Sequence, residues 1–279
     1  MRATPPVRRR GGGAAMLDWF YNTSILITLP LFVGGFVALS CLVVIGVRPV
    51  VRRFVTETKE WDRALGHVIG TFGVFFGILL ALVAVAVYEN FADTRQATIE
   101  EAGDVGALYR ATGGLPDDLD GSMQEVLDAY LHTVIEVDFP DQARGELPSA
   151  SDTQIDEFEA LLHSVEADTR GDQAEFQQAL ATFDDVIESR RARIDATALA
   201  LPALFWLVIW VGAAVNAVLI AFIHFTNPRL HLLMAGLLAL FVGLVIFVTA
   251  DMDHPYAGAI SVGPGAYERV LEQIVDARE

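Results

Sequence analysis

Four long apolar runs constrain this chain more than any other feature of its sequence. Each run holds about 20 or more residues without Asp, Glu, Lys or Arg, the length that an α-helix needs to cross the hydrocarbon core of a bilayer. The hydrophobic content of 53% and the mean hydropathy of +0.42 are also too high for an ordinary soluble domain. The sequence therefore predicts an all-α membrane protein with four transmembrane helices. The four runs are residues 24–47, 67–88, 197–223 and 232–250.

The segment between the second and third runs is strongly acidic. Residues 91–196 carry 25 Asp and Glu against seven Arg and no Lys, a net charge of −18, while the whole chain has −17. This segment is too polar to be embedded in lipid, and its acidity argues against nucleic acid as a partner. Within the segment, apolar residues recur at helical spacing directly after the second run and directly before the third run. We therefore expect helices two and three to extend into an extramembrane helical bundle.

The fourth helix of the acidic domain is expected to begin with a capping box formed by Asp172 and Glu175.

The turn and charge signals divide the chain into nine expected parts. The expected parts are a disordered N-terminus with an interfacial segment (1–23), the first span (24–47), a basic loop (48–66), the second span (67–88), the acidic helical domain (89–196), the third span (197–223), a short loop (224–231), the fourth span (232–250) and a C-terminal tail with an amphipathic helix (251–279).

One face of the second span consists of small residues at steps of three and four. Small residues let helix backbones approach closely in a membrane, where lipid removes the hydrophobic drive for association. The more ordinary interpretation is packing against the first or third span of the same chain. The alternative is a ring of copies of this helix around an axis, in which Phe72, Phe76 and Leu80 form a hydrophobic constriction. The small residues are Gly66, Gly70, Gly73, Gly77, Ala81 and Ala84.

No group of residues indicates an enzyme, a metal centre or a bound cofactor. Asp251, Asp253 and His254 follow the fourth run closely, but the tail offers no clear fourth ligand for a tetrahedral metal. Charge after an apolar run, then Pro255 and Tyr256, is typical of a helix leaving a membrane. No run has an ionisable residue at its middle, which counts against an ion-coupled transporter.

Three arginines, Arg190, Arg191 and Arg193, precede the third span in this otherwise acidic domain. The favoured interpretation is that they pair with carboxylates, and the alternative is a vestibule that attracts anions. The nearby carboxylates are those of Asp185, Glu188 and Asp195.

Basic residues predict the orientation in the membrane. Cytoplasmic loops are enriched in Lys and Arg, and the segment 48–66 holds five of them, while 224–231 adds Arg229. This rule places both loops in the cytoplasm of a multi-pass cell-membrane protein, and the acidic domain outside it. Four Arg within residues 1–10 oppose this orientation, unless translation starts at Met16.

Several motifs resemble the bestrophin-like domain family of bacterial membrane proteins. They are "VYENFADTR" and "EEAGDVGALYR" (87–110), "LPDDL" (115–119), Tyr130, Glu136, "RRAR" (190–193), "LPALFW" (201–206) and "DHPYAG…VGPGAYERV" (253–270). One departure is Val137, where the family pattern has Trp. The signature positions are Glu101, Tyr109, Arg110, Arg190, Arg193, Pro202, Asp253, Pro255 and Gly258.

The resemblance implies a fold and a function. Bestrophins are pentameric ion channels in which the second transmembrane helix lines a hydrophobic neck and extended helices form a domain outside the bilayer. On this basis we expect a homo-oligomeric ion channel whose partners are copies of itself, inorganic ions and the lipid bilayer, with no cofactor. Bestrophins keep their large domain in the cytoplasm, which opposes the orientation predicted from the basic loops. The competing class is a non-conducting membrane sensor or scaffold whose acidic domain binds a ligand or a partner protein.

Overall fold

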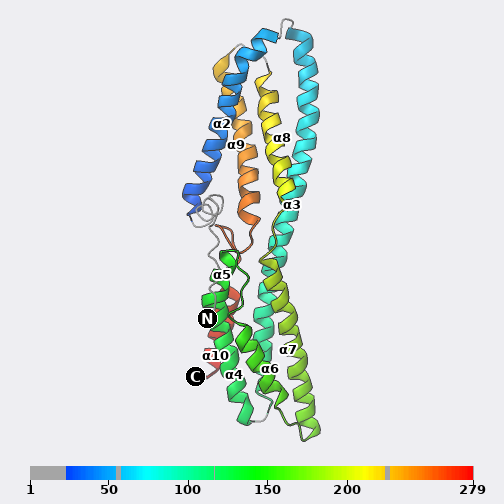
Figure 1. Ribbon diagram of the computed structural model, residues 1–279, viewed down its shortest axis with the longest axis vertical. Coiled ribbons are helices and arrows are strands. Elements are labelled where there is room, and N and C mark those ends of the chain that lie inside the picture. The colour runs from blue at the N-terminus through cyan, green and yellow to red at the C-terminus, as the bar shows by residue number, and fades with distance from the viewer. Residues whose placement is uncertain (1–22, 55–57, 116, 224–226, 279) are drawn as a thin grey trace, which may run out of the picture. The chain divides into compact units, whose positions relative to one another are not determined.

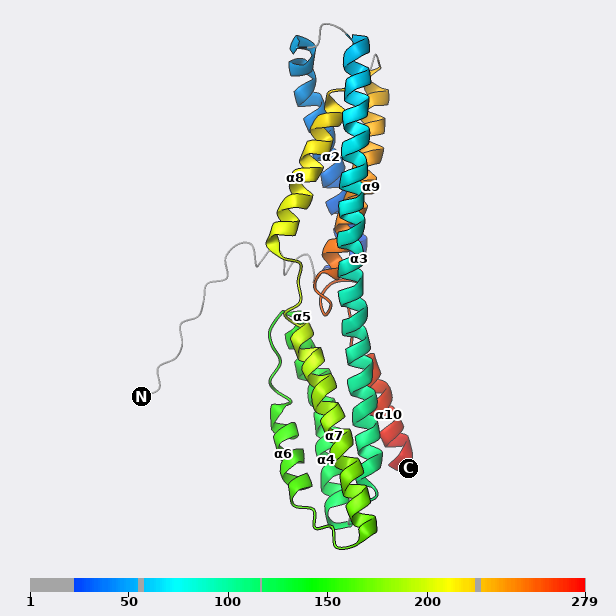
Figure 2. The same ribbon diagram turned by 90° about the vertical axis from the view of Figure 1, so that its right-hand side faces the viewer.

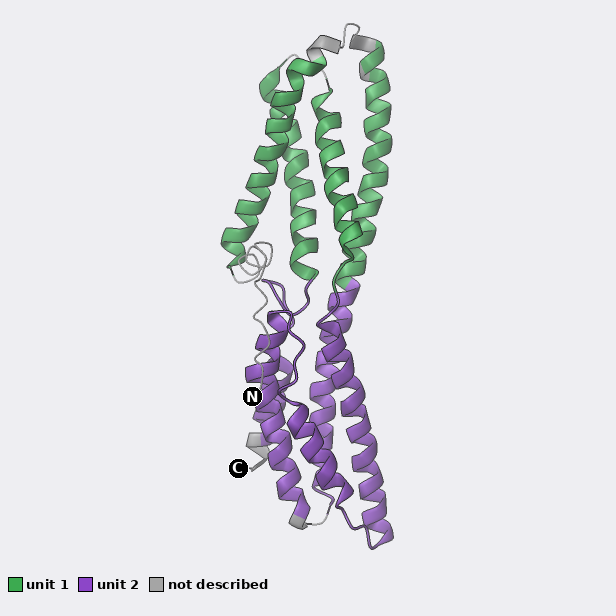
Figure 3. Ribbon diagram, viewed as in Figure 1, with its two compact units in different colours: residues 1–88, 200–253 green, residues 89–199, 254–279 purple. Residues whose placement is uncertain are grey.

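The computed structural model describes residues 23–54, 58–115, 117–223 and 227–278. These residues form helices joined by short connections (Figures 1 and 2). Four of the helices are long and apolar enough to cross a membrane, as the sequence predicted. The chain divides into two compact units, residues 1–88 with 200–253 and residues 89–199 with 254–279 (Figure 3). Most of the expected segment 1–23 and parts of the expected loops 48–66 and 224–231 lie outside the described residues.

Unit 1 contains the apolar helices. It consists of α2 (Ile25–Phe54), the first part of α3 (Thr58–Thr112), α8 (Ala203–Ala221) and α9 (Pro228–Met252). Helix α2 packs along α9 and, less extensively, along α8. Aromatic rings fill this interface: the ring centroids of Phe32 lie 6.3 Å from Trp210 on α8 and 5.7 Å from Phe247 on α9.

The expected basic loop at 48–66 is largely helical. Helix α2 continues to Phe54, and α3 begins at Thr58. Residues 55–57 separate the two helices and lie outside the described ranges. Charged residues end an apolar run without ending a helix, because Lys, Arg and Glu are good helix formers. The loss of hydropathy therefore marked the end of the apolar span and not the end of the helix.

Unit 2 is a bundle built around the second part of α3. Its other elements are α4 (Asp117–Thr133), the π-helical turn η1 (Val134–Asp138), α5 (Phe139–Ala143), α6 (Asp152–His163), α7 (Arg170–Ala196) and α10 (Gly265–Arg278). The continuous course of α3 from the apolar run to Thr112 confirms the extended second helix. In both views α7 runs beside the second part of α3 (Figures 1 and 2).

The core of unit 2 is formed by one face of each of these helices. Leu108 of α3, Met123 and Leu131 of α4, and Phe158 of α6 are all at most 1% exposed. The ring of Phe158 stacks on that of Phe183 of α7, with 5.2 Å between centroids. This apolar core is the scaffold that holds the polar network described below.

The N-cap of helix α7 lies three residues earlier than expected. Thr169 is the N-cap: its side chain accepts a hydrogen bond from the Asp172 backbone N–H, and the Asp172 side chain accepts one from the Thr169 N–H. Asp172 is thus the third helical residue of the capping box and not its first member. Aspartate can occupy either position, so the local pattern left the register ambiguous.

The third span is not continuous with α7. Helix α7 ends at Ala196 and α8 begins at Ala203, with a non-helical connection between them. Pro202 lacks a backbone N–H and disfavours helix in the residue before it. The Leu201 N–H donates instead to a side chain, Asp253 Oδ1, at 2.6 Å. The break shortens the third span from the expected 197–223 to Ala203–Ala221.

Candidate functional site

A salt bridge with no solvent exposure lies at the centre of unit 2. Arg193 Nε on α7 donates to Glu101 Oε2 on α3 at 2.6 Å, and both side chains are fully buried. The hydroxyl of Tyr130 on α4 donates to the other oxygen of the same carboxylate. Three helices are therefore joined through the Glu101 carboxylate. A charged group buried this deeply persists only when its hydrogen bonds are satisfied.

The remaining donors of Arg193 are also used. Its Nη1 donates to Gln142 Oε1 at 2.8 Å, and its Nη2 lies 3.5 Å from Asp138 Oδ2. The guanidinium carbon lies 5.8 Å from the ring centroid of Phe139 and 5.9 Å from that of Tyr267, within cation–π range. Arg193 thus contacts residues of four elements besides its own: α3, η1, α5 and α10.

The π-helical turn η1 carries Asp138 into this network. A π turn inserts an extra residue into a helix and is often found at functional sites. Asp138 is fully buried, and its Oδ2 accepts a hydrogen bond from Ser151 Oγ at 2.6 Å. Arg190 Nη2 in turn donates to Ser151 Oγ at 3.0 Å and to Asp152 Oδ1 at 2.6 Å. Val137, at the family's Trp position, is 41% exposed, so the shorter side chain removes no buried contact.

These contacts confirm that Arg190 and Arg193 pair with carboxylates. Their partners differ from the nearby ones expected: they are Glu101, Asp138 and Asp152, none of which lies on α7. Arg191, between the two, is exposed. Sequence reasoning did not find Gln142 or Ser151, which carry no local signal because their partners lie 13 to 55 residues away along the chain.

The "DHPYAG" motif supplies further parts of both units. In unit 1, Asp253 accepts hydrogen bonds from the Leu201 N–H at 2.6 Å and from Trp206 Nε1 at 3.1 Å. In unit 2, the Tyr256 hydroxyl donates to the Arg193 backbone oxygen at 2.9 Å. Gly258 has a φ of +92°, which favours glycine. The polar groups of the motif therefore form hydrogen bonds with the backbone just before α8 and in the last turn of α7.

The other signature positions are a loop residue, Pro255, and two residues of α3, Tyr109 and Arg110. The Val262 N–H donates to the Pro255 oxygen at 2.8 Å and closes the loop that contains Gly258. Tyr109 is buried in the core, whereas Arg110 is exposed. Among the described residues, no group of three His, Cys, Asp or Glu side chains is placed to hold a metal ion.

Burial dominates the acid–base properties of the three tyrosines in the network. It raises the pKa of Tyr256 to about 12. It also raises the pKa values of Tyr130 and Tyr267 well above the ordinary range, and the negative charge of Glu101 adds to this effect. Burial by itself would lower the pKa of Arg193, but the adjacent Glu101 carboxylate outweighs it and raises that pKa. All four groups are therefore held in their protonated forms.

We expect unit 2 to lose stability between pH 10 and pH 12. The unfolded chain loses the Tyr256 proton at about pH 10, whereas the folded chain keeps it until about pH 12. The contribution is present in full below pH 10 and disappears as pH rises to 12, a loss of roughly 2 to 3 kcal/mol. Urea titration followed by circular dichroism measures it. Tyr256→Phe should show a shallower decline over this range, and an equally steep decline would contradict the assignment.

The small-residue face of α3 is not covered by any part of the chain that the structure describes. A Cβ added at Gly66, Gly70, Gly73 or Gly77 would meet no atom within 4 Å. Packing against the first or third span therefore does not explain these glycines. Ala81 is also exposed and Ala84 is half-buried.

Two of the three residues expected to form a neck are covered inside unit 1. Phe76 is 7% exposed and Leu80 is 8% exposed, while Phe72 is half-buried and stacks on Phe76 with 5.6 Å between ring centroids. The Phe76 ring lies directly against Gly212 of α8. At about 100° per residue, Val74, Ile78 and Val85 lie on the side of α3 opposite Phe76, and all three are more than half exposed.

The helical spans and the buried network define a four-span helical membrane protein with an additional helical unit. Residues 34–267 match the family model of the Bestrophin-like domain, so the chain belongs to the Bestrophin-like family. No curated protein matches the chain.

Solved structures share this fold. A bacterial bestrophin homologue from Klebsiella pneumoniae, in a single-substitution variant, has a TM-score of 0.64 at 12% identity, covering 91% of this chain and 100% of the homologue. A second variant of it has a TM-score of 0.61 at 13% identity, covering 88% and 98%. A further membrane protein has a TM-score of 0.60 at 13% identity, covering 88% and 97%. At these identities the likeness establishes the fold alone.

Proposed function

We propose that this protein is the subunit of a homo-oligomeric ion channel, in which copies of α3 surround a central path. The observation that carries the proposal is the uncovered glycine face of α3. Glycine in a helix is costly unless something uses the missing side chain, and none of the described residues does so at these four positions. A neighbouring copy of the chain would use it, because small residues allow close helix contact in lipid. Membership of the Bestrophin-like family supports the same conclusion.

The geometry of α3 suggests which side chains form the constriction. In a ring, the side of α3 covered by its own subunit points outward, and the opposite side points to the axis. Because Phe76 and Leu80 are covered, we assign the constriction to Val74, Ile78 and Val85 in their place. An apolar ring of this kind gates by dewetting. Phe72, half-buried beside Phe76, contributes to the packing behind it.

Ion flux from liposomes containing the purified protein tests this proposal. We expect Gly73→Leu to abolish flux, because the leucine occupies the space that a neighbouring helix needs, and Ile78→Ala to raise flux by widening the constriction. Native mass spectrometry should show an oligomer for the unmodified protein, and a smaller species for Gly73→Leu. The resemblance to bestrophins favours five subunits.

Gly35→Leu is the matched control, because Gly35 on α2 also has no atom within 4 Å of an added Cβ. It should conduct as the unmodified protein does. Equal loss of flux in both leucine variants would contradict a specific role for the α3 face. Absence of ion flux from a folded, monomeric protein would favour the non-conducting sensor, whose ligand site would lie in unit 2.

We also propose that unit 2 lies outside the cytoplasm of a cell-membrane protein, as the basic residues of 48–66 indicate. Protease digestion of sealed vesicles of known orientation checks this. Cleavage within 89–199 only from the cytoplasmic side would reverse the orientation.

A further inference from the structure

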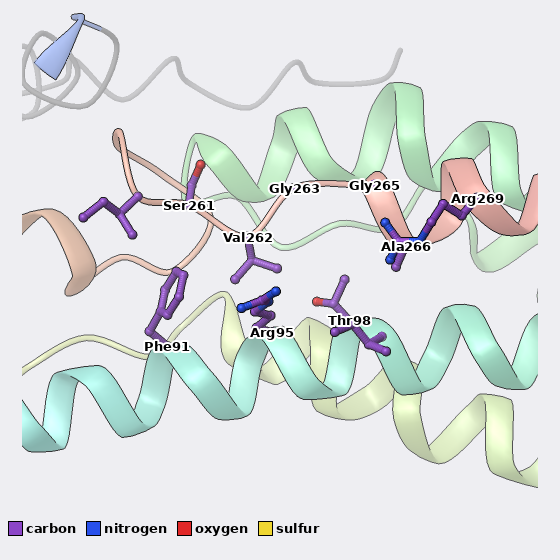
Figure 4. A pocket seen from close by; sticks show the side chains of 11 residues that line it. Phe91, Arg95, Thr98, Ser261, Val262, Gly263, Gly265, Ala266 and Arg269 are labelled. Carbon is purple, nitrogen blue, oxygen red and sulfur yellow. The ribbon is translucent and has the colours of Figure 1, made fainter.

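A pocket of about 470 Å³ lies in unit 2, and Arg193 is not among its lining residues (Figure 4). Its walls are α3, the segment 260–265 and the start of α10. Its volume falls within the range of small-molecule sites, which is about 300 to 1,000 Å³. Arg95 reaches it from α3 and Arg269 from α10, so two elements far apart in the sequence each supply a guanidinium group.

The charge of this pocket is opposite to that of the chain. No Asp or Glu lines it, although the chain has a net charge of −17. Among the described residues, the side chains of Arg95 and Arg269 make no hydrogen bond and no ion pair. Those of Arg190 and Arg193, in contrast, form ion pairs with carboxylates. Glu268, next to Arg269 in sequence, is exposed and does not line the pocket. Two unpaired guanidinium groups facing one cavity are suited to binding an anion with several oxygens.

Backbone groups add to this positive potential. Gly265 and Ala266 begin α10, a helix of 14 residues, and both line the pocket. The first N–H groups of a helix have no partner within it and favour a negative charge. Both residues line the same cavity as the two arginines. The Glu268 carboxylate lies at the same helix end, because its Oε2 would be 3.8 Å from a Cβ added at Gly265, so the two guanidinium groups are the main source of positive charge there.

Apolar side chains form part of the remaining lining, together with Thr98 and Ser261. Phe91, Ile99 and Val262 line the pocket. Phe91 follows Tyr88, the last residue of the second apolar run, by three residues, roughly 5 Å along α3 at about 1.5 Å per residue. Arg95, four residues further along α3, is therefore roughly 10 Å beyond the end of that run at about 1.5 Å per residue.

We propose that this pocket binds a phosphate group, carried either by an anionic phospholipid or by a small soluble molecule. Guanidinium groups form paired hydrogen bonds with phosphate oxygens, and the helix N-terminus complements the same charge. The apolar wall accommodates the first carbons next to the phosphate. This site is additional to the proposed channel and does not depend on conduction.

Isothermal titration calorimetry of the full chain in neutral detergent tests the proposal. The two probes are dioctanoyl phosphatidylglycerol and inorganic phosphate. The test variant is Arg95→Gln with Arg269→Gln, and the control is Arg191→Gln, which removes one arginine charge from an exposed position outside the pocket. Because all three arginines are exposed, thermal unfolding should be unchanged in both variants.

We expect the double variant to weaken binding by on the order of tenfold or more, and the control to leave it unchanged. Loss confined to the phosphatidylglycerol titration identifies the lipid as the source, and loss of inorganic phosphate binding identifies a soluble one. The proposal is overturned if the unmodified protein binds neither probe, or if Arg191→Gln weakens binding as much as the double variant does.

Discussion

Replacing Arg193 by Met should destabilise unit 2 by about 3 to 5 kcal/mol. The substitution keeps much of the side-chain length but leaves the Glu101 carboxylate, which is fully buried, without its cation. An unpaired buried charge costs far more than the pair contributed, because its hydration is lost and nothing replaces it. Gln142 and Asp138 lose a donor at the same time.

Hydrogen–deuterium exchange gives the clearest measurement of this effect. The tryptophans of the chain lie outside residues 89–199, so their fluorescence does not report on unit 2. We expect faster exchange in peptides of α3 after Thr98 and of α7 in the Arg193→Met protein. Exchange in α2 and α9, which belong to unit 1, should change little.

Two further variants separate charge burial from simple loss of packing. Arg191→Met, two residues away and exposed, should change stability by less than about 0.5 kcal/mol. Adding Glu101→Gln to Arg193→Met should recover part of the loss, because the buried charge is then gone. If Arg191→Met destabilised unit 2 as much as Arg193→Met, the buried salt bridge would not be the cause.

Gly212→Ala should destabilise unit 1 by about 3 kcal/mol or more. The new Cβ would overlap Cε2 of Phe76 and lie 2.6 Å from its Cδ2, so the two helices α3 and α8 must move apart or the ring must leave its position. Extra atoms in a well-packed interior typically cost about 1 to 3 kcal/mol, and two ring atoms at such distances place this site at the upper end. Trp206 and Trp210 on α8 allow thermal unfolding in micelles to be followed by fluorescence.

A double-mutant cycle with Phe76→Ala tests the proposed cause. Phe76→Ala alone leaves a cavity and should cost about 3 to 5 kcal/mol. Combined with Gly212→Ala it should cost less than the sum, because the added methyl enters the space of the lost ring. Gly236→Ala is the control: its Cβ would lie 3.7 Å from Val37, an ordinary contact, so the change should be small. Additive losses in the cycle would exclude direct contact between residues 76 and 212.

The polar network shows where sequence reasoning reached its limit. The resemblance marked Glu101, Arg190 and Arg193 as signature positions, and the excess of acidic residues indicated that the arginines are paired. Arg193 nevertheless pairs with a glutamate 92 residues earlier and not with a neighbour on α7. Partner choice depends on which faces of α3 and α7 meet, and this is decided by packing of the whole core.

The spans and the long second helix were determined by the sequence itself. Uncharged length and helical spacing are local properties, and a bilayer imposes the same length on every chain. The rotation of α3 about its own axis was decided only by the tertiary structure. A helix that is apolar all round has no polar face to distinguish inside from outside, so Phe76 and Gly73 were equally good candidates for either side. Contact of Phe76 with Gly212 turned the phenylalanine inward and left the glycines uncovered.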